Sequence, residues 1–141
     1  MKFLLDTCVI SELASKSPCL EVVNWINRQE LKNIFLSVLT IGEIKNGVAK
    51  LKDQSRKKVL QAWLQNELLE TFGSQIIEIN LQVALKWGQL IGDLDLVGKP
   101  MPAVDSIIAA QALEYECILV TRNVDDFKNS GVQLLNPWNF S

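Results

Sequence analysis

The chain has 141 residues, a net charge of −2 at pH 7 and 48% apolar residues, which is typical of one globular domain with a substantial core. It contains no histidine, which excludes every mechanism that needs an imidazole as base, nucleophile or metal ligand. It also lacks an apolar run of the ~20 residues that span a bilayer, and its first residues lack a signal-peptide pattern, so we expect a cytoplasmic protein with no membrane partner.

The first third of the chain alternates short apolar runs with helical patterns. Residues 2–5, "KFLL", predict a buried strand, and residues 7–15 and 19–29 predict helices. Residues 34–38, "IFLSV", predict a second strand. Residues 39–51 place apolar side chains at spacings of three, four and three, which predicts a helix.

The middle of the chain continues the alternation. Residues 53–72 predict one long helix that ends at Gly73 as a C-cap. Its expected inward side chains are Val59, Leu60, Trp63, Leu64 and Leu68. Residues 76–79 predict a short strand, and residues 81–94 predict a further amphipathic helix.

The last third predicts a loop at 97–102, a helix at 103–116, a buried strand at 117–121 and an edge strand within 132–138. Because the strands are short continuous apolar runs separated by helices, we expect an α/β fold. Its central sheet should be mostly parallel, with helices on both faces, in one domain over residues 1–141. The three cysteines, Cys8, Cys19 and Cys117, have no paired spacing, which argues against disulfides and a zinc site, and Cys117 should be a core residue.

Charge is unevenly distributed along the chain. Residues 45–58 hold six basic residues and one acid, whereas residues 67–126 hold ten acids and three basic residues. A basic segment near a cation-loaded acidic pocket suits a polyanion, although a solvated pair of helices explains the basic run equally well.

Several acids lie at strand ends or early in helices. Asp6 directly follows the first strand, Glu43 lies one turn into the helix after the second, and Asp105 lies in the first turn of the helix over 103–116. Asn123 and Asp126 follow the strand at 117–121. Because ligands bind beyond the carboxyl ends of parallel strands, these side chains are expected to converge on one cleft.

Each acid also has a purely structural interpretation. Asp6 is a favoured N-cap residue, Asp105 suits the dipole of its own helix, Glu43 fits a solvated helix face and Asp126 fits a turn. Together, however, like charges in one cleft require raised pKa values or a bound cation. Oxygen ligands select a hard cation such as Mg²⁺ or Mn²⁺, which can activate water for displacement at phosphorus without histidine.

The sequence resembles the PIN-domain ribonucleases, and more narrowly the VapC-type toxins of toxin–antitoxin pairs. The resemblance rests on four segments, "LLDTCVISEL" at the start, "LSVLTIGEIKNGV" at 36–48, "VDSIIAAQALEYECILVTRNVDDF" at 104–127 and "LLNPW" at 134–138. Their order and spacing extend the resemblance over the whole domain.

The resemblance implies catalytic roles for four acids. Asp6, Glu43 and Asp105 match the metal-binding acids of the family. Asn123 stands where many relatives carry an aspartate, and Asp126 is the nearby acid that would serve in its place.

Other residues follow from the same alignment of motifs. The family commonly has asparagine where this chain has Cys8, which puts the local geometry in doubt more than metal binding. Asn123, Thr121 and Ser37 are expected to orient the ligands or water around the metal. Ordinary strand-end hydroxyls are an equally good account of Thr121 and Ser37.

The resemblance further implies Mg²⁺- or Mn²⁺-dependent endonucleolytic cleavage of RNA, with Arg122, Lys45 and Lys50 as candidate RNA contacts. The implied partners are a cognate antitoxin and a second copy of the chain, in a homodimer and a toxin–antitoxin hetero-oligomer. Trp25 and Trp63 are candidates for these contacts, with core packing at least as good an explanation.

Three other classes of protein are alternatives to a PIN-domain ribonuclease. A haloacid-dehalogenase-like phosphatase needs a second aspartate where Cys8 stands, and a receiver domain needs a lysine that "VTRN" does not supply. A non-catalytic PIN-like RNA-binding scaffold is the serious alternative.

Overall fold

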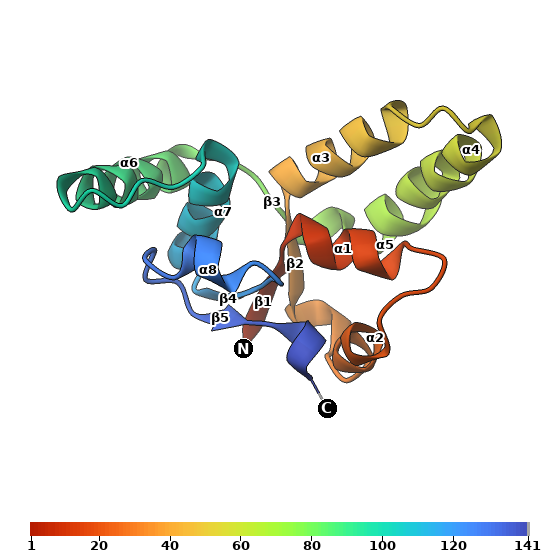
Figure 1. Cartoon of the computed structure of the whole chain (residues 1–141), viewed down its shortest axis with the longest axis horizontal. Coiled ribbons are helices and arrows are strands. Elements are labelled where there is room, and N and C mark those ends of the chain that lie inside the picture. Colours follow the sequence, from red (N-terminus) through yellow and green to blue (C-terminus); the bar gives the residue numbers. More distant parts are fainter. Residues whose placement is uncertain (141) are drawn as a thin grey trace.

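The computed structural model describes residues 1–140 and contains one sheet of five strands (Figure 1). The spatial order is β3-β2-β1-β4-β5, and each of the four pairings between neighbours is parallel. The predicted α/β fold is therefore confirmed, with a sheet that is parallel throughout. The strands are β1 Lys2–Leu5, β2 Ile34–Ser37, β3 Ile76–Ile77, β4 Cys117–Val120 and β5 Leu134–Leu135.

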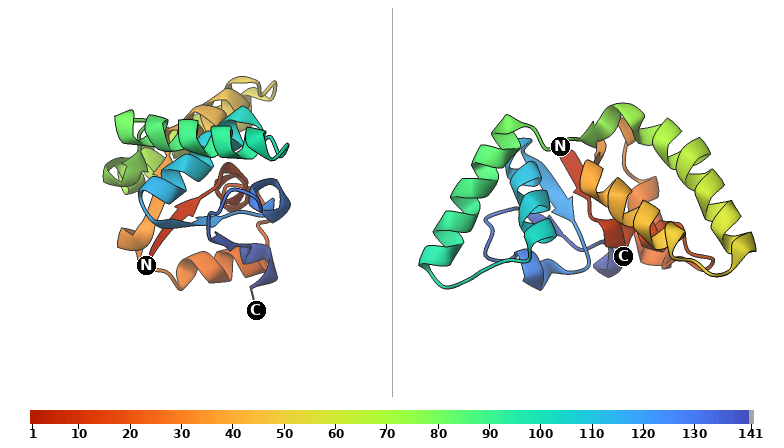
Figure 2. Two further views of the ribbon diagram at one scale, coloured as in Figure 1. Left: turned by 90° about the vertical axis from the view of Figure 1, so that its left-hand side faces the viewer. Right: turned by 90° about the horizontal axis from the view of Figure 1, so that it is seen from above.

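Helices cover both faces of this sheet, as predicted. In Figure 1 and in the view from above in Figure 2, α6 extends as an arm on one side, and α3 and α4 form a second arm on the other. The helices are α1 Thr7–Leu13, α2 Leu20–Asn27, α3 Val38–Ala49, α4 Gln54–Trp63, α5 Leu69–Phe72, α6 Leu81–Leu96, α7 Ala103–Glu114 and α8 Val124–Phe127. Short helical turns occur at η1 Leu31–Asn33, η2 Leu64–Leu68, η3 Gly73–Gln75 and η4 Pro137–Asn139.

The alternation of side chains along the strands separates two cores. Phe3 pairs in register with Ile118, and both belong to the core beneath α1, α2 and η2. Leu4 pairs with Leu119, and both belong to the opposite core beneath α6, α7 and α8. Because successive residues of a strand point to opposite faces, one apolar run supplies both cores.

The helix predicted over 53–72 is confirmed as an unbroken helical segment, with one feature that the pattern did not predict. α4 ends at Trp63, and Leu64–Leu68 forms a π-helical turn that leads directly into α5. Leu64 and Leu68 are buried, as predicted, whereas Val59, which was expected inward, is 57% exposed. Gly73 is the C-cap of α5, as predicted, and its backbone is right-handed there, with φ −51°.

Two predicted strands are shorter than the apolar runs that predicted them. The run at 76–79 pairs only at Ile76 and Ile77, and the run at 132–138 only at Leu134 and Leu135. Both are edge strands of the sheet, where pairing on one side limits their length.

The buried tryptophan of α2 belongs to the core. Trp25 is 3% exposed, and its ring packs edge-on against Phe3 with centroids 5.1 Å apart. Its interpretation as a docking residue is therefore wrong, whereas Trp63 stays partly exposed. Cys117 is buried, as predicted.

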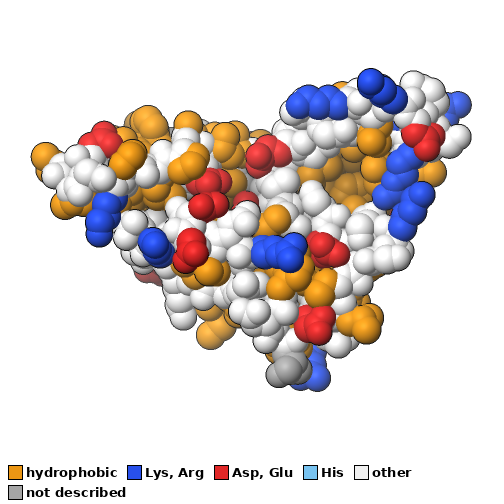
Figure 3. Space-filling model, viewed as in Figure 1, with side chains coloured by type: hydrophobic (Ala, Val, Ile, Leu, Met, Phe, Trp, Pro, Cys, Tyr) orange, Lys and Arg blue, Asp and Glu red, His pale blue; other side chains and the backbone are white. Residues whose placement is uncertain are grey.

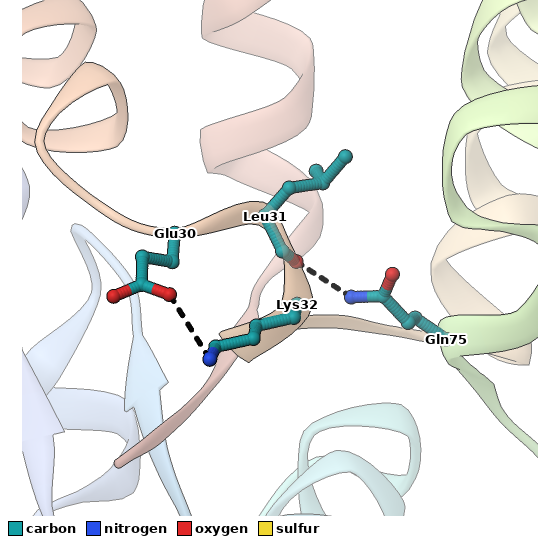
Figure 4. Close-up of polar contacts among 4 residues, drawn as sticks. All are labelled: Glu30, Leu31, Lys32 and Gln75. Carbon is teal, nitrogen blue, oxygen red and sulfur yellow. Dashed lines mark hydrogen bonds and ion pairs between the residues drawn. The ribbon is translucent and has the colours of Figure 1, made fainter.

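Polar contacts at the amino end of β2 attach the turn before β3 to the turn before β2. The Gln75 amide donates to the Leu31 carbonyl at 2.7 Å and also to the Ile34 carbonyl (Figure 4). Lys32 and Glu30, which lie in the same turn, form an exposed ion pair at 3.2 Å. This end of the sheet lies opposite the acids described below. Among residues 1–140, no helix is long and apolar enough to cross a membrane.

Candidate acidic site at the carboxyl edge of the sheet

Asp6 lies where β1 ends and α1 begins, and it is 7% exposed. It is the N-cap of α1, since its Oδ1 accepts a hydrogen bond from the Thr7 backbone N–H at 2.9 Å. Its Oδ2 accepts a hydrogen bond from the Thr121 hydroxyl at 2.8 Å. Burial raises the pKa of Asp6, the bonds from Thr121 and Thr7 lower it, and the charge of Glu43 adds to the rise.

The residues after β4 form one wall around Asp6. Thr121 is fully buried, and its hydroxyl also accepts a hydrogen bond from the Asn123 backbone N–H at 3.0 Å. Cys8 lies against the same pair, with Sγ 3.8 Å from Asp6 Oδ2 and 3.6 Å from Thr121 Oγ1. Cys8 therefore occupies a position beside the carboxylate, in the place where the family commonly has asparagine.

Glu43 reaches the site from α3 through Thr7. The Thr7 hydroxyl donates to Glu43 Oε1 at 2.6 Å and lies 3.1 Å from the hydroxyl of the buried Thr40. One residue therefore contacts two acids, because the Thr7 backbone N–H bonds Asp6 and its side chain bonds Glu43. Thr7 and Thr40 were not among the predicted site residues, although the position of Thr7 directly after Asp6 was an available signal.

Asp105 lies in the first turn of α7, as predicted, and is partly buried. Burial raises its pKa to about 6, and the charges of Asp6, Asp126 and Glu43 add to the rise in that order. All three other predicted acids therefore lie close enough to influence Asp105. The four carboxylates form what we call the acidic site: Asp6, Glu43, Asp105 and Asp126.

Figure 3 shows acidic side chains gathered in the notch between α7 and α3, whereas Lys and Arg side chains follow the arm of α3 and α4. Within residues 1–140, no three acidic or cysteine side chains lie close enough to form a closed set of metal ligands. The donors are nevertheless all oxygens, and they share an electrostatic cost that a cation relieves. These residues fit Mg²⁺, which is usually held by one or two carboxylates and retains several waters.

The predicted supporting residues behave differently from one another. Ser37 is buried and caps α3 by accepting from the Leu39 backbone N–H at 3.1 Å, which is its ordinary structural role. Asn123 precedes α8, and its exposed side chain does not cap that helix. Asp126 lies within α8 and is exposed, and its negative charge contributes to the raised pKa of Asp105.

The predicted basic contacts fall into two groups. Arg122 directly follows Thr121, and its guanidinium lies over the Trp138 ring at 5.2 Å from the centroid, which is a cation–π distance. Lys45 lies on the exposed surface of α3, two residues after Glu43, and Lys50 is the C-cap of the same helix. Arg122 therefore directly follows the residue that bonds Asp6, with its guanidinium over Trp138, whereas Lys50 lies at the carboxyl end of α3.

A largely apolar groove of about 300 Å³ opens beside Glu43, between α1, α3 and α4. Figure 3 shows it as an apolar hollow below the basic arm. Ile44, Leu51, Leu60 and Trp63 line its walls.

Comparison with known proteins gives the same assignment over nearly the whole chain. The family model for the PIN domain matches residues 3–131. Toxin FitB of Neisseria gonorrhoeae is 34% identical over 135 residues, covering 96% of this chain and 97% of that protein. VapC ribonuclease Y4jK of Sinorhizobium fredii is 30% identical over 135 residues, covering 96% of each.

Solved structures agree in fold. The crystal structure of FitAcB from Neisseria gonorrhoeae contains a chain with a TM-score of 0.94 and 33% identity, covering 98% of this chain and 99% of that one. VapBC2 from Rickettsia felis, bound to a promoter DNA fragment, has a TM-score of 0.77 and 26% identity, covering 96% and 98%. The chain therefore belongs to the PIN-domain family, among the toxins of the VapC and FitB type.

Proposed function

We propose that this protein is the toxin of a toxin–antitoxin pair and that it cleaves RNA as a Mg²⁺- or Mn²⁺-dependent endoribonuclease. The observation that carries the proposal is the gathering of four carboxylates, Asp6, Glu43, Asp105 and Asp126, at the carboxyl edge of one parallel sheet, close enough that the other three raise the pKa of Asp105. The names of the relatives, VapC ribonuclease and toxin FitB, support the same activity.

In this proposal Asp6, Glu43 and Asp105 would hold the cation, each directly or through one of the waters that Mg²⁺ retains, and Asp126 completes the acidic site. A bound Mg²⁺ or Mn²⁺ supplies an activated water and stabilises negative charge at the phosphorus. Thr121 fixes the orientation of the Asp6 carboxylate through its hydrogen bond to Oδ2. Burial raises the pKa of Asp105 and the three neighbouring carboxylates add to the rise, and a bound cation relieves the repulsion among these charges.

The RNA would approach along the basic surfaces that flank the acids. Arg122 is held by Trp138 next to the acidic site, where its guanidinium can bond a phosphate. Lys45 and Lys50 extend positive charge along α3, which suits a backbone that continues beyond the cleavage site. We place this activity in the cytoplasm, where the RNA substrate is found.

The proposed partner is a cognate antitoxin, in keeping with the FitAB and VapBC complexes of the relatives. The apolar groove between α1, α3 and α4 is the proposed docking site for an apolar segment of that antitoxin. Because Glu43 lines the groove, a basic side chain from the same segment would reach the acidic site and oppose metal binding. We further propose that the chain forms a homodimer and a toxin–antitoxin hetero-oligomer.

The test is expression of the wild type, Asp6→Asn and Asp105→Asn in an inducible bacterial host, with cleavage of labelled RNA by the purified proteins. Glu30→Gln is the matched control, because Glu30 is an exposed acid at the opposite end of the sheet. We expect growth arrest and cleavage with Mg²⁺ or Mn²⁺ for the wild type and the control, and their loss with EDTA.

Both aspartate variants should fold and lose cleavage. Cleavage that persists in both folded variants would place the chemistry elsewhere. Absence of cleavage by every form over a broad RNA panel, with RNA binding retained, would favour the non-catalytic scaffold.

A further inference from the structure

Thr7 forms hydrogen bonds to both Asp6 and Glu43, two acids that lie far apart in the sequence. Its backbone N–H donates to Asp6 Oδ1 at 2.9 Å, and its hydroxyl donates to Glu43 Oε1 at 2.6 Å. The second bond is short, as is usual when a hydroxyl donates to a carboxylate. The hydroxyl of Thr40, fully buried in α3, lies 3.1 Å from that of Thr7 and limits its freedom to rotate.

Glu43 has little else to fix its side chain. It is exposed on α3, and a glutamate on a helix surface loses considerable rotamer freedom when it is held in one orientation. The only hydrogen bond to the Glu43 side chain in residues 1–140 is the one from Thr7. The rigid N-terminus of α1, capped by Asp6, therefore orients a flexible side chain on another helix.

We propose that Thr7 is a positioning residue that holds the Glu43 carboxylate toward the acidic site and thereby raises the affinity of the site for a divalent cation. Groups that orient metal ligands typically change metal affinity by about 10–100-fold when they are removed. The proposal rests on the proposed function only in taking Glu43 as a cation ligand. It extends that function by assigning a role to a residue that lies between two of the carboxylates.

The primary test measures Mn²⁺ binding to the full-length protein by titration calorimetry, without RNA. Thr7→Val removes the hydroxyl and keeps the branched shape, whereas Thr7→Ser keeps the hydroxyl. Thr71→Val is the matched control, since Thr71 is an exposed threonine of another helix, α5. We expect Thr7→Val to weaken Mn²⁺ binding by about 10-fold or more, and Thr7→Ser and Thr71→Val to bind as the wild type does.

A double-mutant cycle with Glu43→Gln separates positioning from general damage. If Thr7 acts through Glu43, the effect of Thr7→Val on Mn²⁺ affinity should vanish in the Glu43→Gln background. Thr7→Ala provides the same test if the valine variant fails to fold, with folding checked by thermal unfolding. Equal Mn²⁺ affinity for wild type and a folded Thr7 variant, or an undiminished effect in the Glu43→Gln background, would overturn the proposal.

RNA cleavage distinguishes this proposal from the proposed function. With Thr7→Val, the Mg²⁺ concentration for half-maximal cleavage should rise, and the maximal rate at saturating Mg²⁺ should recover most of the wild-type value. If the wild type binds Mn²⁺ in a Thr7-dependent way but cleaves no RNA, the proposed function fails while the role of Thr7 stands.

Discussion

The Thr121 hydroxyl donates to Asp6 Oδ2 at 2.8 Å, although 115 positions separate the two residues in the sequence. The contact arises because β4 pairs with β1 in parallel register, with Leu5 beside Val120, so that the next residue of each strand emerges at the same edge. Both side chains are buried there. Together with the bond from the Thr7 backbone N–H to Oδ1, this hydrogen bond compensates the buried carboxylate for part of its lost solvation.

Removal of that donor should destabilise the protein. For Thr121→Val we expect a loss of about 1–3 kcal/mol in the free energy of unfolding, because a buried carboxylate oxygen loses its partner. Thr121→Ser keeps the donor and should lose less. Urea unfolding at pH 7 in EDTA measures both variants, and equal stability of the valine and serine variants would contradict the role assigned to the hydroxyl.

Asp105 should make the metal-free protein less stable at neutral pH. Its folded-state pKa of about 6 exceeds the ordinary value of 3.8, so the folded state binds the proton more tightly than the unfolded state does. Stability from this group is present at low pH and is lost as pH rises through about 6. In EDTA, Asp105→Asn should therefore raise the thermal midpoint at pH 7.5 and have little effect at pH 4.

Mg²⁺ supplies the control for the Asp105 prediction. The cation should stabilise the wild type more than Asp105→Asn and so reduce the difference between their midpoints at pH 7.5. A difference that is unchanged between pH 4 and pH 7.5 would show that ionisation of Asp105 is not its cause.

The Cys8 thiol should react slowly despite its partial exposure. Burial raises its pKa and the charge of Asp6 adds to the rise, against the Arg122 backbone N–H, which lowers it. Since the thiolate is the nucleophile, alkylation of Cys8 by iodoacetamide at pH 7.5 should be slower in the folded protein than in urea. Peptide mapping by mass spectrometry gives the rate of alkylation at Cys8. Faster alkylation in the folded protein than in urea would contradict a raised pKa of the thiol.

Arg122 should contribute to RNA binding through the support of Trp138. Arg122→Gln should weaken binding and reduce the salt dependence of the affinity by about one phosphate contact. Trp138→Leu keeps an apolar side chain and removes the cation–π contact, so it should show part of the same loss. Fluorescence anisotropy with a catalytically inactive Asp6→Asn background measures both, and an unchanged salt slope in Arg122→Gln would exclude a phosphate contact.

Lys45 and Lys50 of α3 should contribute less to RNA affinity than Arg122 does, and they should act over a longer range. Lys45→Gln with Lys50→Gln should lower RNA affinity and the salt slope without changing the metal requirement. Lys32→Gln is the control, because Lys32 is an exposed lysine at the opposite end of the sheet. Because the double variant removes two charges and the control removes one, an effect of the double variant no larger than twice that of the control would indicate that only net charge matters.

The helix over 53–72 shows what a local pattern predicts and what it misses. Apolar spacing predicted the helical segment and the inward Leu64 and Leu68, which lie in a core shared with β1 and β2, but it did not reveal the π-helical turn at Leu64–Leu68. The sequence of α2 also could not show whether Trp25 contacts a partner protein or belongs to the core. Trp25 is buried because Phe3, on a distant strand, packs against its ring.

The sequence by itself determined the parallel α/β fold and the edge at which Asp6, Glu43 and Asp105 gather. Those conclusions depend on periodicity and on the direction of parallel strands, which are local or topological properties. Only the tertiary structure decided that Thr121 bonds Asp6 and that Thr7 bonds Glu43. These contacts join residues far apart in the chain, and side-chain packing between β1, β4, α1 and α3 sets their geometry.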